Sequence, residues 1–277
     1  MIPRLLHFVW IQGTGPKTFG YGEFLSVVSA LTNTTYDVML HTNLTPAAAN
    51  PYCPYRIVHP RFRIQRRDMP LAVHGVKARM ANLSDIWRIK VLQEHGGLYS
   101  DTDILWFGDV SLPEADFVAA YENPSYKTVA NAFLAAVPGY APLAGLLETF
   151  DGVFHALAAK GVTDLTVDPP AGLSKHHVLL WKTTGDFSKA HGVLLGKQHF
   201  YRNGWRRIGR CLRRAGVPLK PVVDVTALGN TDDRLQLKGL TGFHYYATLY
   251  DIEQLLDLPD FRELLTPVLD AATTFLA

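Results

Sequence analysis

Residues 95–107 read His-Gly-Gly-Leu-Tyr-Ser-Asp-Thr-Asp-Ile-Leu-Trp-Phe, and this stretch decides the fold. Upstream of it, residues 77–95 contain few helix-breaking residues and predict a helix, which Gly96 and Gly97 close where a left-handed cap belongs. Residues 98–107 then predict a strand with a polar interruption. A helix that leads directly into a strand is typical of folds in which helices pack on a mostly parallel sheet.

The neighbouring segments continue this alternation of strands and helices. We expect strands at 5–11, 36–41 and 128–137, and helices at 21–32 and 142–159. Elsewhere the pattern is weaker. We expect a short strand at 56–58 within the Pro- and Arg-rich residues 46–75, and short elements and loops over 160–250, with apolar segments at 178–181 and 243–250. Residues 252–276 have the apolar spacing of a helix. No repeat or linker divides the chain, so we expect one α/β domain over residues 1–277 with helices on both faces of the sheet.

The composition is that of a soluble globular protein. Of 277 residues, 48% are hydrophobic and 19% are charged, and no run of about 18 apolar residues indicates a spanning helix. The apolar run that follows Met1 is too short for a signal peptide. Cys53 and Cys211 lie far apart and outside any metal-binding spacing, which favours free thiols in a reducing compartment. We therefore expect a cytoplasmic protein.

A basic segment stands out against the small net charge of +2. Residues 202–220 contain seven Lys and Arg residues and no acidic residue. Such a segment could bind a phosphate-rich acceptor, a nucleic acid or the surface of a membrane. In the last case the protein would be a peripheral membrane protein. The segment could equally be the solvated face of a helix.

Asp101 and Asp103 are the first candidates for chemistry. Side chains at i and i+2 of an extended backbone point the same way, so the two carboxylates can converge on one cation. Hard oxygen ligands suit Mg²⁺ or Mn²⁺, which keep positions open for water or substrate phosphate. Two aspartates at this spacing are common in loops, so the pair alone is a weak signal. Its place inside an apolar strand strengthens it, because burying carboxylates without a counter-charge is costly.

The preceding helix carries Asp85 and Arg88, which are three residues apart and share one face. An arginine fork there suits phosphate or sugar oxygens, and a carboxylate suits sugar hydroxyls. The alternative is a surface ion pair that contributes little to stability.

Three blocks together resemble glycosyltransferase family 32, whose sugar-binding region contains a DXD motif. The blocks are residues 6–11 (LHFVWI), 81–88 (ANLSDIWR) and 95–103 (HGGLYSDTD), and their order and separation also fit that family. The resemblance covers the first 110 residues or so. It implies a GT-A-like fold with donor and metal binding in residues 1–110 and acceptor features in residues 130–277.

The resemblance also implies roles for single residues. Trp10 would stack on the base of the donor, with a core tryptophan as the alternative. Ser84, Asp85 and Arg88 would line the donor sugar. Asp101 would contact the ribose or the sugar, and would join Asp103, the direct ligand, at the metal.

Later agreement with the family is thinner. Asn131 resembles an asparagine on a strand near the donor, and His244 resembles the late histidine that completes the metal or phosphate site, although a structural histidine is an equal alternative. Residues 183–185 (TTG) resemble a Thr-Gly-Pro turn, but Asp186 replaces the proline. Thr248 and Leu249 stand where the family has a Ser-Trp pair.

The implied activity is that of a retaining, metal-dependent hexosyltransferase that takes a sugar from a nucleotide-sugar donor. UDP-sugars are the first expectation and GDP-mannose the second, with Mn²⁺ or Mg²⁺ as the metal. We expect a glycan or glycolipid acceptor, as in polysaccharide biosynthesis. An anionic acceptor could contact the basic residues 202–220. DNA and protein acceptors are the alternatives. A protein that binds sugar nucleotides without catalysis is a further alternative. A phosphatase of the haloacid dehalogenase type is disfavoured, because its Asp-x-Asp pair follows the first strand.

Overall fold

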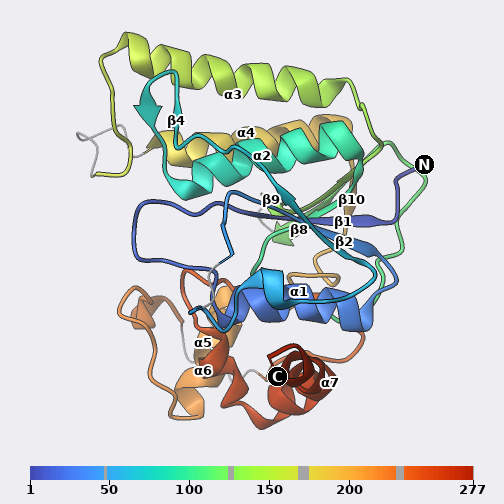
Figure 1. The fold of residues 1–277 in the computed structure, drawn as a ribbon. Coiled ribbons are helices and arrows are strands. Elements are labelled where there is room, and N and C mark those ends of the chain that lie inside the picture. Colours follow the sequence, from blue (N-terminus) through green and yellow to red (C-terminus); the bar gives the residue numbers. More distant parts are fainter. Residues whose placement is uncertain (47–48, 124–127, 168–174, 229–233, 277) are drawn as a thin grey trace.

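We describe the fold from a computed structural model of the chain, which covers residues 1–46, 49–123, 128–167, 175–228 and 234–276. A seven-stranded sheet forms its centre (Figure 1). Its strands, given in their order across the sheet, are β10 (Val193–Leu195), β8 (Phe117–Asn123), β9 (Thr128–Ala136), β6 (Gly97–Ser100), β1 (Leu5–Trp10), β2 (Asp37–Thr42) and β3 (Phe62–Arg66). All neighbours are parallel except β9, which is antiparallel to both β6 and β8. This is the mostly parallel α/β sheet predicted from the sequence.

Two small antiparallel pairs lie outside this sheet. They are β4 (Ala72–Val73) with β5 (Val76–Lys77), and β7 (Ile104–Trp106) with β11 (Gly242–His244). The second pair matters for the site, because it joins the late part of the chain to the segment that directly follows β6.

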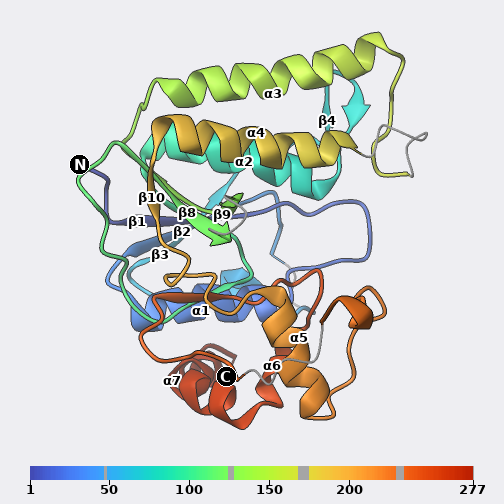
Figure 2. The same ribbon diagram turned by 180° about the vertical axis from the view of Figure 1, so that it is seen from behind.

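Helices cover both faces of the sheet, as predicted. Above it in Figure 1 lie α2 (Met80–His95), α3 (Pro142–Ala159) and α4 (Lys175–His191). Below it lie α1 (Tyr21–Asn33), α5 (Trp205–Arg214), α6 (Ile252–Leu256) and α7 (Pro259–Leu276), and the reverse view in Figure 2 shows the same two layers. Two short 3-10 helices, at Pro54–Arg56 and Val225–Leu228, are also found among the described residues. Within the described part of the chain, no helix is both long enough and apolar enough to cross a membrane.

The sheet has a hydrophobic core on each of its two faces, and strand β1 contributes side chains to both. Its side chains alternate, so that Leu6, Phe8 and Trp10 pack with α1 and α7 while Val9 packs with α2 and α3 on the other face. Successive residues of a strand point to opposite faces, and a strand covered on both sides must be apolar at nearly every position. The continuous apolar run at the start of the chain is therefore the sequence signal of a central strand.

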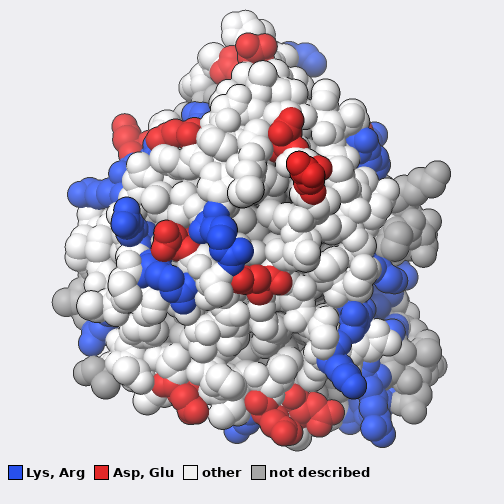
Figure 3. Space-filling view, turned by 90° about the vertical axis from the view of Figure 1, so that its right-hand side faces the viewer, with Lys and Arg blue, Asp and Glu red and all other residues white. Residues whose placement is uncertain are grey.

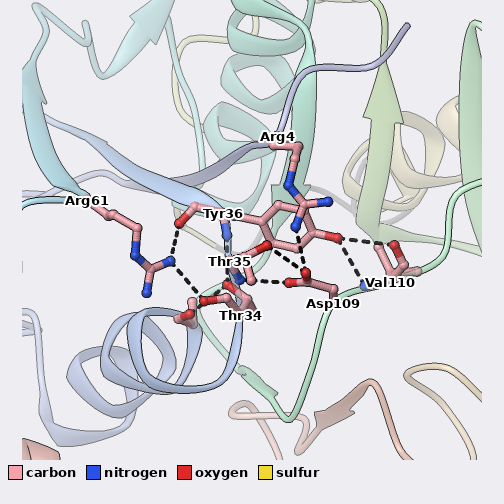
Figure 4. Close-up of polar contacts among 8 residues, drawn as sticks. Arg4, Thr34, Thr35, Tyr36, Arg61, Asp109 and Val110 are labelled. Atoms are coloured by element: carbon pink, nitrogen blue, oxygen red, sulfur yellow. Dashed lines mark hydrogen bonds and ion pairs between the residues drawn. The ribbon is translucent and has the colours of Figure 1, made fainter.

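The end of α1 is held by a compact polar cluster at the edge where β1 begins (Figure 4). Arg61 donates hydrogen bonds to the carbonyl oxygens of Leu31, Thr34 and Tyr36, which satisfies acceptors that the last turn of a helix leaves open. Nearby, the Asp109 carboxylate accepts hydrogen bonds from the backbone and side chain of Thr35 and pairs with Arg4. Figure 3 faces this side of the molecule and shows charges of both signs scattered over it, with Lys and Arg gathered at the lower right.

Gly96 and Gly97 connect α2 to β6, and their backbone explains why both are glycines. Each has a positive φ, 65° and 88° respectively, which favours residues without a Cβ. A Cβ at Gly97 would meet the carbonyl oxygen of Leu5, and one at Gly96 would meet the backbone nitrogen of Pro138. The predicted helix stop is thus confirmed, and the glycines also allow β6 to approach its neighbours closely.

Three sequence predictions were wrong in detail. Residues 54–56 form a 3-10 helix that begins at a proline, and Val58 is exposed, so the expected strand at 56–58 is replaced by β3 further along. Residues 175–191 form one helix instead of short elements and loops. The helical stretch at 252–276 is divided, because the residue before Pro259 disfavours helical geometry.

A buried row of histidines lies between β1, β2 and the end of α2. His7 Nε2 donates to the carbonyl oxygen of Gly96, so its Nδ1 accepts from His41 Nε2 at 2.9 Å. His41 Nδ1 in turn accepts from Arg67 Nε at 3.4 Å. This chain of donors and acceptors requires both histidines to be neutral. Burial lowers the pKa of His7 to about 4 and that of His41 to about 2. The positive charge of Arg67 contributes to both shifts as a smaller cause.

These two histidines predict acid sensitivity. Their pKa values are depressed in the folded state, so the unfolded chain binds more protons below pH 6.5 and the free energy of unfolding falls as pH falls from about 6.5 toward 4. We expect a loss of about 2 kcal/mol per histidine between pH 7 and pH 5, measured by urea unfolding. His41→Gln should remove about half of this dependence. His155→Gln, at an exposed position, should leave it unchanged, and equal pH profiles for the two variants would contradict the assignment.

Candidate functional site

A cleft of about 400 Å³ lies at the carboxyl ends of β1 and β6, where ligands bind in open α/β sheets. Of the residues singled out in the sequence, its wall contains Trp10, Ser84, Arg88, Asp101 and Asp103. The other three lie behind the wall: Asp85 and Asn131 contact Arg88, and His244 contacts Asp103. All eight residues therefore belong to one site, although they come from five separate elements of the chain.

Asp101 and Asp103 lie in a turn between β6 and β7, and this corrects one sequence argument. The amide of Ile104 donates to the carbonyl oxygen of Asp101 at 3.2 Å, so the backbone folds back and is not extended here. The two carboxylates share the cleft because of this turn rather than through the alternation of a strand. Ser26 of α1 donates to the carbonyl oxygen of Thr102 at 2.6 Å and fixes the turn from below.

Arg88 is the most heavily bonded side chain of the site. Five protein atoms lie within 3.3 Å of its guanidinium nitrogens, a number equal to its five N–H groups. They are the carbonyl and hydroxyl oxygens of Ser84, the carbonyl oxygen of Asn131, and one carboxylate oxygen each of Asp85 and Asp101. The sequence suggested a fork open to substrate oxygens. The structure instead uses the fork to hold the protein's own acceptors in place.

Asp85 is buried beneath Arg88, at 3.0 Å from its Nη2, and its Oδ1 accepts a hydrogen bond of 2.7 Å from Asn131 Nδ2. Burial raises the pKa of Asp85 to about 7, although Arg88 opposes this shift. Burial lowers the pKa of Arg88, but the charges of Asp101, Tyr99 and Asp85 outweigh it and raise the pKa overall. Arg88 therefore stays charged, and the ion pair is not the surface pair considered as the alternative.

The two aspartates of the turn have opposite environments. Burial raises the pKa of Asp101, and its Oδ1 is bonded to Tyr99 Oη at 2.5 Å and to Arg88 Nη1 at 3.2 Å. The pKa of Asp103 is lowered: burial raises it, but His244 at 3.1 Å and the amide of Ala247 at 2.9 Å outweigh that effect. The His244 pKa is raised in turn, because Asp103 outweighs its burial. Asp103 is thus the carboxylate that the protein keeps ionised.

The Trp10 side chain packs in the hydrophobic core and also lines the cleft. Its ring packs edge-on against Phe19 at a centroid distance of 5.4 Å, and the ammonium of Lys17 lies 5.1 Å over its face. The Trp10 Nε1 atom is buried without a hydrogen-bond partner among the described residues. Trp10 therefore packs in the core, as one of the two sequence interpretations had it, and its contact with the base of a donor stays a prediction.

The donor atoms present fit a divalent cation only in part. Among the described residues, no three His, Cys, Asp or Glu side chains are grouped so that they could hold a metal by themselves. However, Asp103 Oδ1 is buried, and within the described residues it has an ion-pair contact with His244 Nε2 at 3.1 Å but no hydrogen bond of good geometry; Asp101 lies in the same wall. Mg²⁺ and similar cations are commonly held by one or two carboxylates together with substrate phosphates. The pair therefore fits an ion that is completed by a diphosphate.

Tyr99 was missed in the sequence, although it carries a signal. It lies two positions before Asp101, so both side chains are on the same face, and its ring supports the Arg88 guanidinium at 4.7 Å. Residues 183–185 are not part of the site, because they lie in the middle of α4 and form no turn. Thr184 there is buried and donates a hydrogen bond to the carbonyl oxygen of Leu180 in its own helix.

The match to known proteins agrees with the resemblance seen in the sequence. Residues 36–117 match the family described as the glycosyltransferase sugar-binding region containing DXD motif. No curated protein matches the chain at a significant level. The matched region contains α2, the two glycines and the turn that carries Asp101 and Asp103. This part of the chain is thus similar to the DXD-containing sugar-binding region of glycosyltransferases.

Several solved glycosyltransferases are similar in fold. The apo-form glycosyltransferase GlyE of Streptococcus pneumoniae TIGR4 has a TM-score of 0.53 at 10% identity, over 99% of this chain and 62% of that one. The galactosyltransferase LgtC in complex with donor and acceptor sugar analogs has a TM-score of 0.45 at 12% identity, over 95% of each chain. The PaToxG glycosyltransferase has a TM-score of 0.40 at 16% identity, over 68% of this chain and 77% of that one. The chain spans about three fifths of the GlyE structure. The fold is GT-A-like, as predicted.

The burial of Arg88 predicts a large effect on stability. Arg88→Gln would leave two carboxylates buried without their cation, and we expect the free energy of unfolding to fall by about 3–5 kcal/mol in urea titrations at pH 8. Arg63→Gln, an exposed position on β3, should change it by less than about 0.5 kcal/mol. A small effect at both positions would show that the ion cluster is not needed to hold the cleft together.

Proposed function

We propose that this chain, with a DXD-type sugar-binding region on a GT-A-like fold, is a retaining, metal-dependent hexosyltransferase that uses a nucleotide-sugar donor. The observation that carries the proposal is the turn with Asp101 and Asp103 in the wall of the cleft, inside the region that matches the family. UDP-sugars are the first donors to test and GDP-mannose the second. A DXD pair that meets a diphosphate would use Mn²⁺ or Mg²⁺.

Each element of the site has a part in this proposal. Asp103 would bind the cation directly and Asp101 would share it or contact the donor ribose, while Trp10 would cover the base. When bound, the cation would neutralise the charge that develops on the leaving diphosphate. Ser84 would meet the donor sugar, and Asp85 with Asn131 would act from behind by holding Arg88 and thereby the cleft wall. His244 would hold Asp103 in position or join it at the cation.

The proposed transfer retains the configuration at the anomeric carbon. The bond from that carbon to the diphosphate oxygen breaks, the acceptor oxygen bonds to the same face, and the acceptor proton passes to an oxygen of the leaving diphosphate. The buried position of Asp85, paired with Arg88 and outside the cleft wall, supports this front-face route over a covalent intermediate on Asp85. The protein then acts through positioning and charge stabilisation.

We further propose that residues 1–110 bind the donor and that residues 130–277 supply most acceptor contacts, with a glycan or glycolipid as the acceptor. DNA and protein are the alternative acceptors. Cys53 is a free thiol buried in the fold, which supports the proposed cytoplasmic location.

The decisive experiment is donor hydrolysis with a panel of UDP- and GDP-sugars in Mn²⁺, Mg²⁺ or EDTA. We expect slow, metal-dependent release of one nucleotide, because water replaces a missing acceptor. Asp103→Asn should lower this rate at least about a hundredfold while the chain stays folded, with a lower unfolding midpoint because the ion pair with His244 is lost.

Asp68→Asn, which removes one exposed carboxylate, is the matched control and should hydrolyse the donor normally. Full metal-dependent turnover by Asp103→Asn would refute the site assignment. If no donor is hydrolysed but one of them raises the unfolding midpoint, the protein binds sugar nucleotides without catalysis.

A further inference from the structure

A second cavity, of about 480 Å³, opens beside the cleft and is strongly basic. We name it the basic pocket; its charged wall residues are Glu122, Lys197, Arg202, Arg206, Arg207 and Arg210. Glu122 is at the end of β8, and Lys197 and Arg202 follow β10. Both strands run parallel to β1 and β6, so the basic pocket and the cleft share the same edge of the sheet.

The basic pocket is joined to the DXD turn through short contacts. The Tyr201 ring, in the pocket wall, packs edge-on against the His244 ring at a centroid distance of 5.2 Å, and His244 Nε2 lies 3.1 Å from Asp103. The backbone is joined as well, because the amide of His244 donates to the carbonyl oxygen of Phe200 at 3.2 Å. A molecule in this pocket therefore lies next to the group proposed to hold the donor.

Three of the basic side chains carry charge that no acidic group of the described chain neutralises. Arg202 donates to the carbonyl oxygen of Lys238, Arg206 lies 5.1 Å over the Trp205 ring, and Lys197 is exposed. Throughout the described ranges, none of the three forms an ion pair. Charges arranged in this way favour an anionic ligand.

A second observation indicates that the ligand also carries hydroxyl groups. The Tyr201 hydroxyl is buried in the pocket wall and has no hydrogen-bond partner within the described residues. An unsatisfied buried hydroxyl is costly to stability, and a ligand atom that bonds to it would remove that cost. Glu122 lies in the same wall as an acceptor, and Trp181 and Trp205 add aromatic faces suited to the apolar side of a sugar ring.

We propose that the basic pocket is the acceptor site and that its ligand is a saccharide bearing a phosphate or carboxylate group. Lys197, Arg202 and Arg206 would bind the anion, and Tyr201 and Glu122 would hold a hydroxyl of the ring that faces the donor. The proposal rests on the proposed function, because it names the class of acceptor for the same transfer. It also gives the basic segment of the sequence a role beyond that of a solvated helix face.

The test uses the full chain and three simple probes: methyl α-glucoside 6-phosphate, methyl α-glucuronide and methyl α-glucoside. Binding is measured by titration calorimetry, and donor hydrolysis is followed separately in the same preparations. We expect at least one anionic probe to bind, with an affinity that falls as salt is added, and the neutral probe to bind at least about tenfold more weakly. The tighter of the two anionic probes identifies phosphate or carboxylate.

The variant Lys197→Ala with Arg206→Ala should weaken binding of that probe about tenfold or more. Its matched control, Arg63→Ala with Lys160→Ala, removes the same charge at exposed positions away from both cavities and should bind normally. The control double variant should hydrolyse the donor at the wild-type rate. Absence of hydrolysis in every preparation would count against the proposed function, whereas the binding result tests the pocket independently.

Four outcomes would overturn the proposal. Equal binding of neutral and anionic glycosides, or equal affinity in the two double variants, would show that the pocket does not select an anionic saccharide. Inorganic phosphate that binds as tightly as the sugar phosphate would reduce the pocket to an anion site. A DNA oligonucleotide that displaces the probes and loses affinity in the pocket variant would make nucleic acid the ligand.

Discussion

The buried guanidinium of Arg88 joins three elements at the cleft: helix α2, strand β9 and the turn after β6. Its contacts reach Ser84 and Asp85 on α2, Asn131 on β9 and Asp101 after β6, so one side chain fixes the spacing of helix, strand and turn. Taking a cation out of water is costly, and its position is stable only while both carboxylates and the carbonyl oxygens remain in place. The helix therefore cannot move relative to the DXD turn without exposing or unpairing a charge.

This arrangement also explains why two aspartates that are two residues apart differ. Asp101 faces Arg88 and Tyr99, whereas Asp103 faces His244 and the amide of Ala247, which come from the last part of the chain. The first environment raises the pKa of its carboxyl and the second lowers it. A pair of identical side chains thus offers one carboxylate built into the protein framework and one that is kept ionised at the cleft.

The sequence predicts best those features that depend on neighbouring residues. The bounds of α3, the helix stop at Gly96 and Gly97, and the buried strand at the start of the chain all follow from local pattern and backbone sterics. The turn at 101–103 was read as a strand because its shape is set by Ser26 of α1 and by the late loop. Glu122 and Tyr201 carry no local signal either, since only the sheet order brings β8 and the segment after β10 to the same edge.

The late loop shows how the two parts of the chain depend on each other. Tyr246 has a φ of 57°, a left-handed conformation that a bulky residue adopts only when its surroundings require it. This turn aims the amide of Ala247 at Asp103, and a hydrogen bond to a charged group contributes about 1.5–3 kcal/mol, enough to offset the strain. The DXD carboxylate therefore holds the loop as much as the loop holds the carboxylate. His244, just before this loop, pairs with Asp103 and also packs on Tyr201. A displacement of Asp103 would therefore shift the wall of the basic pocket. The cleft and the basic pocket are thus structurally coupled through His244.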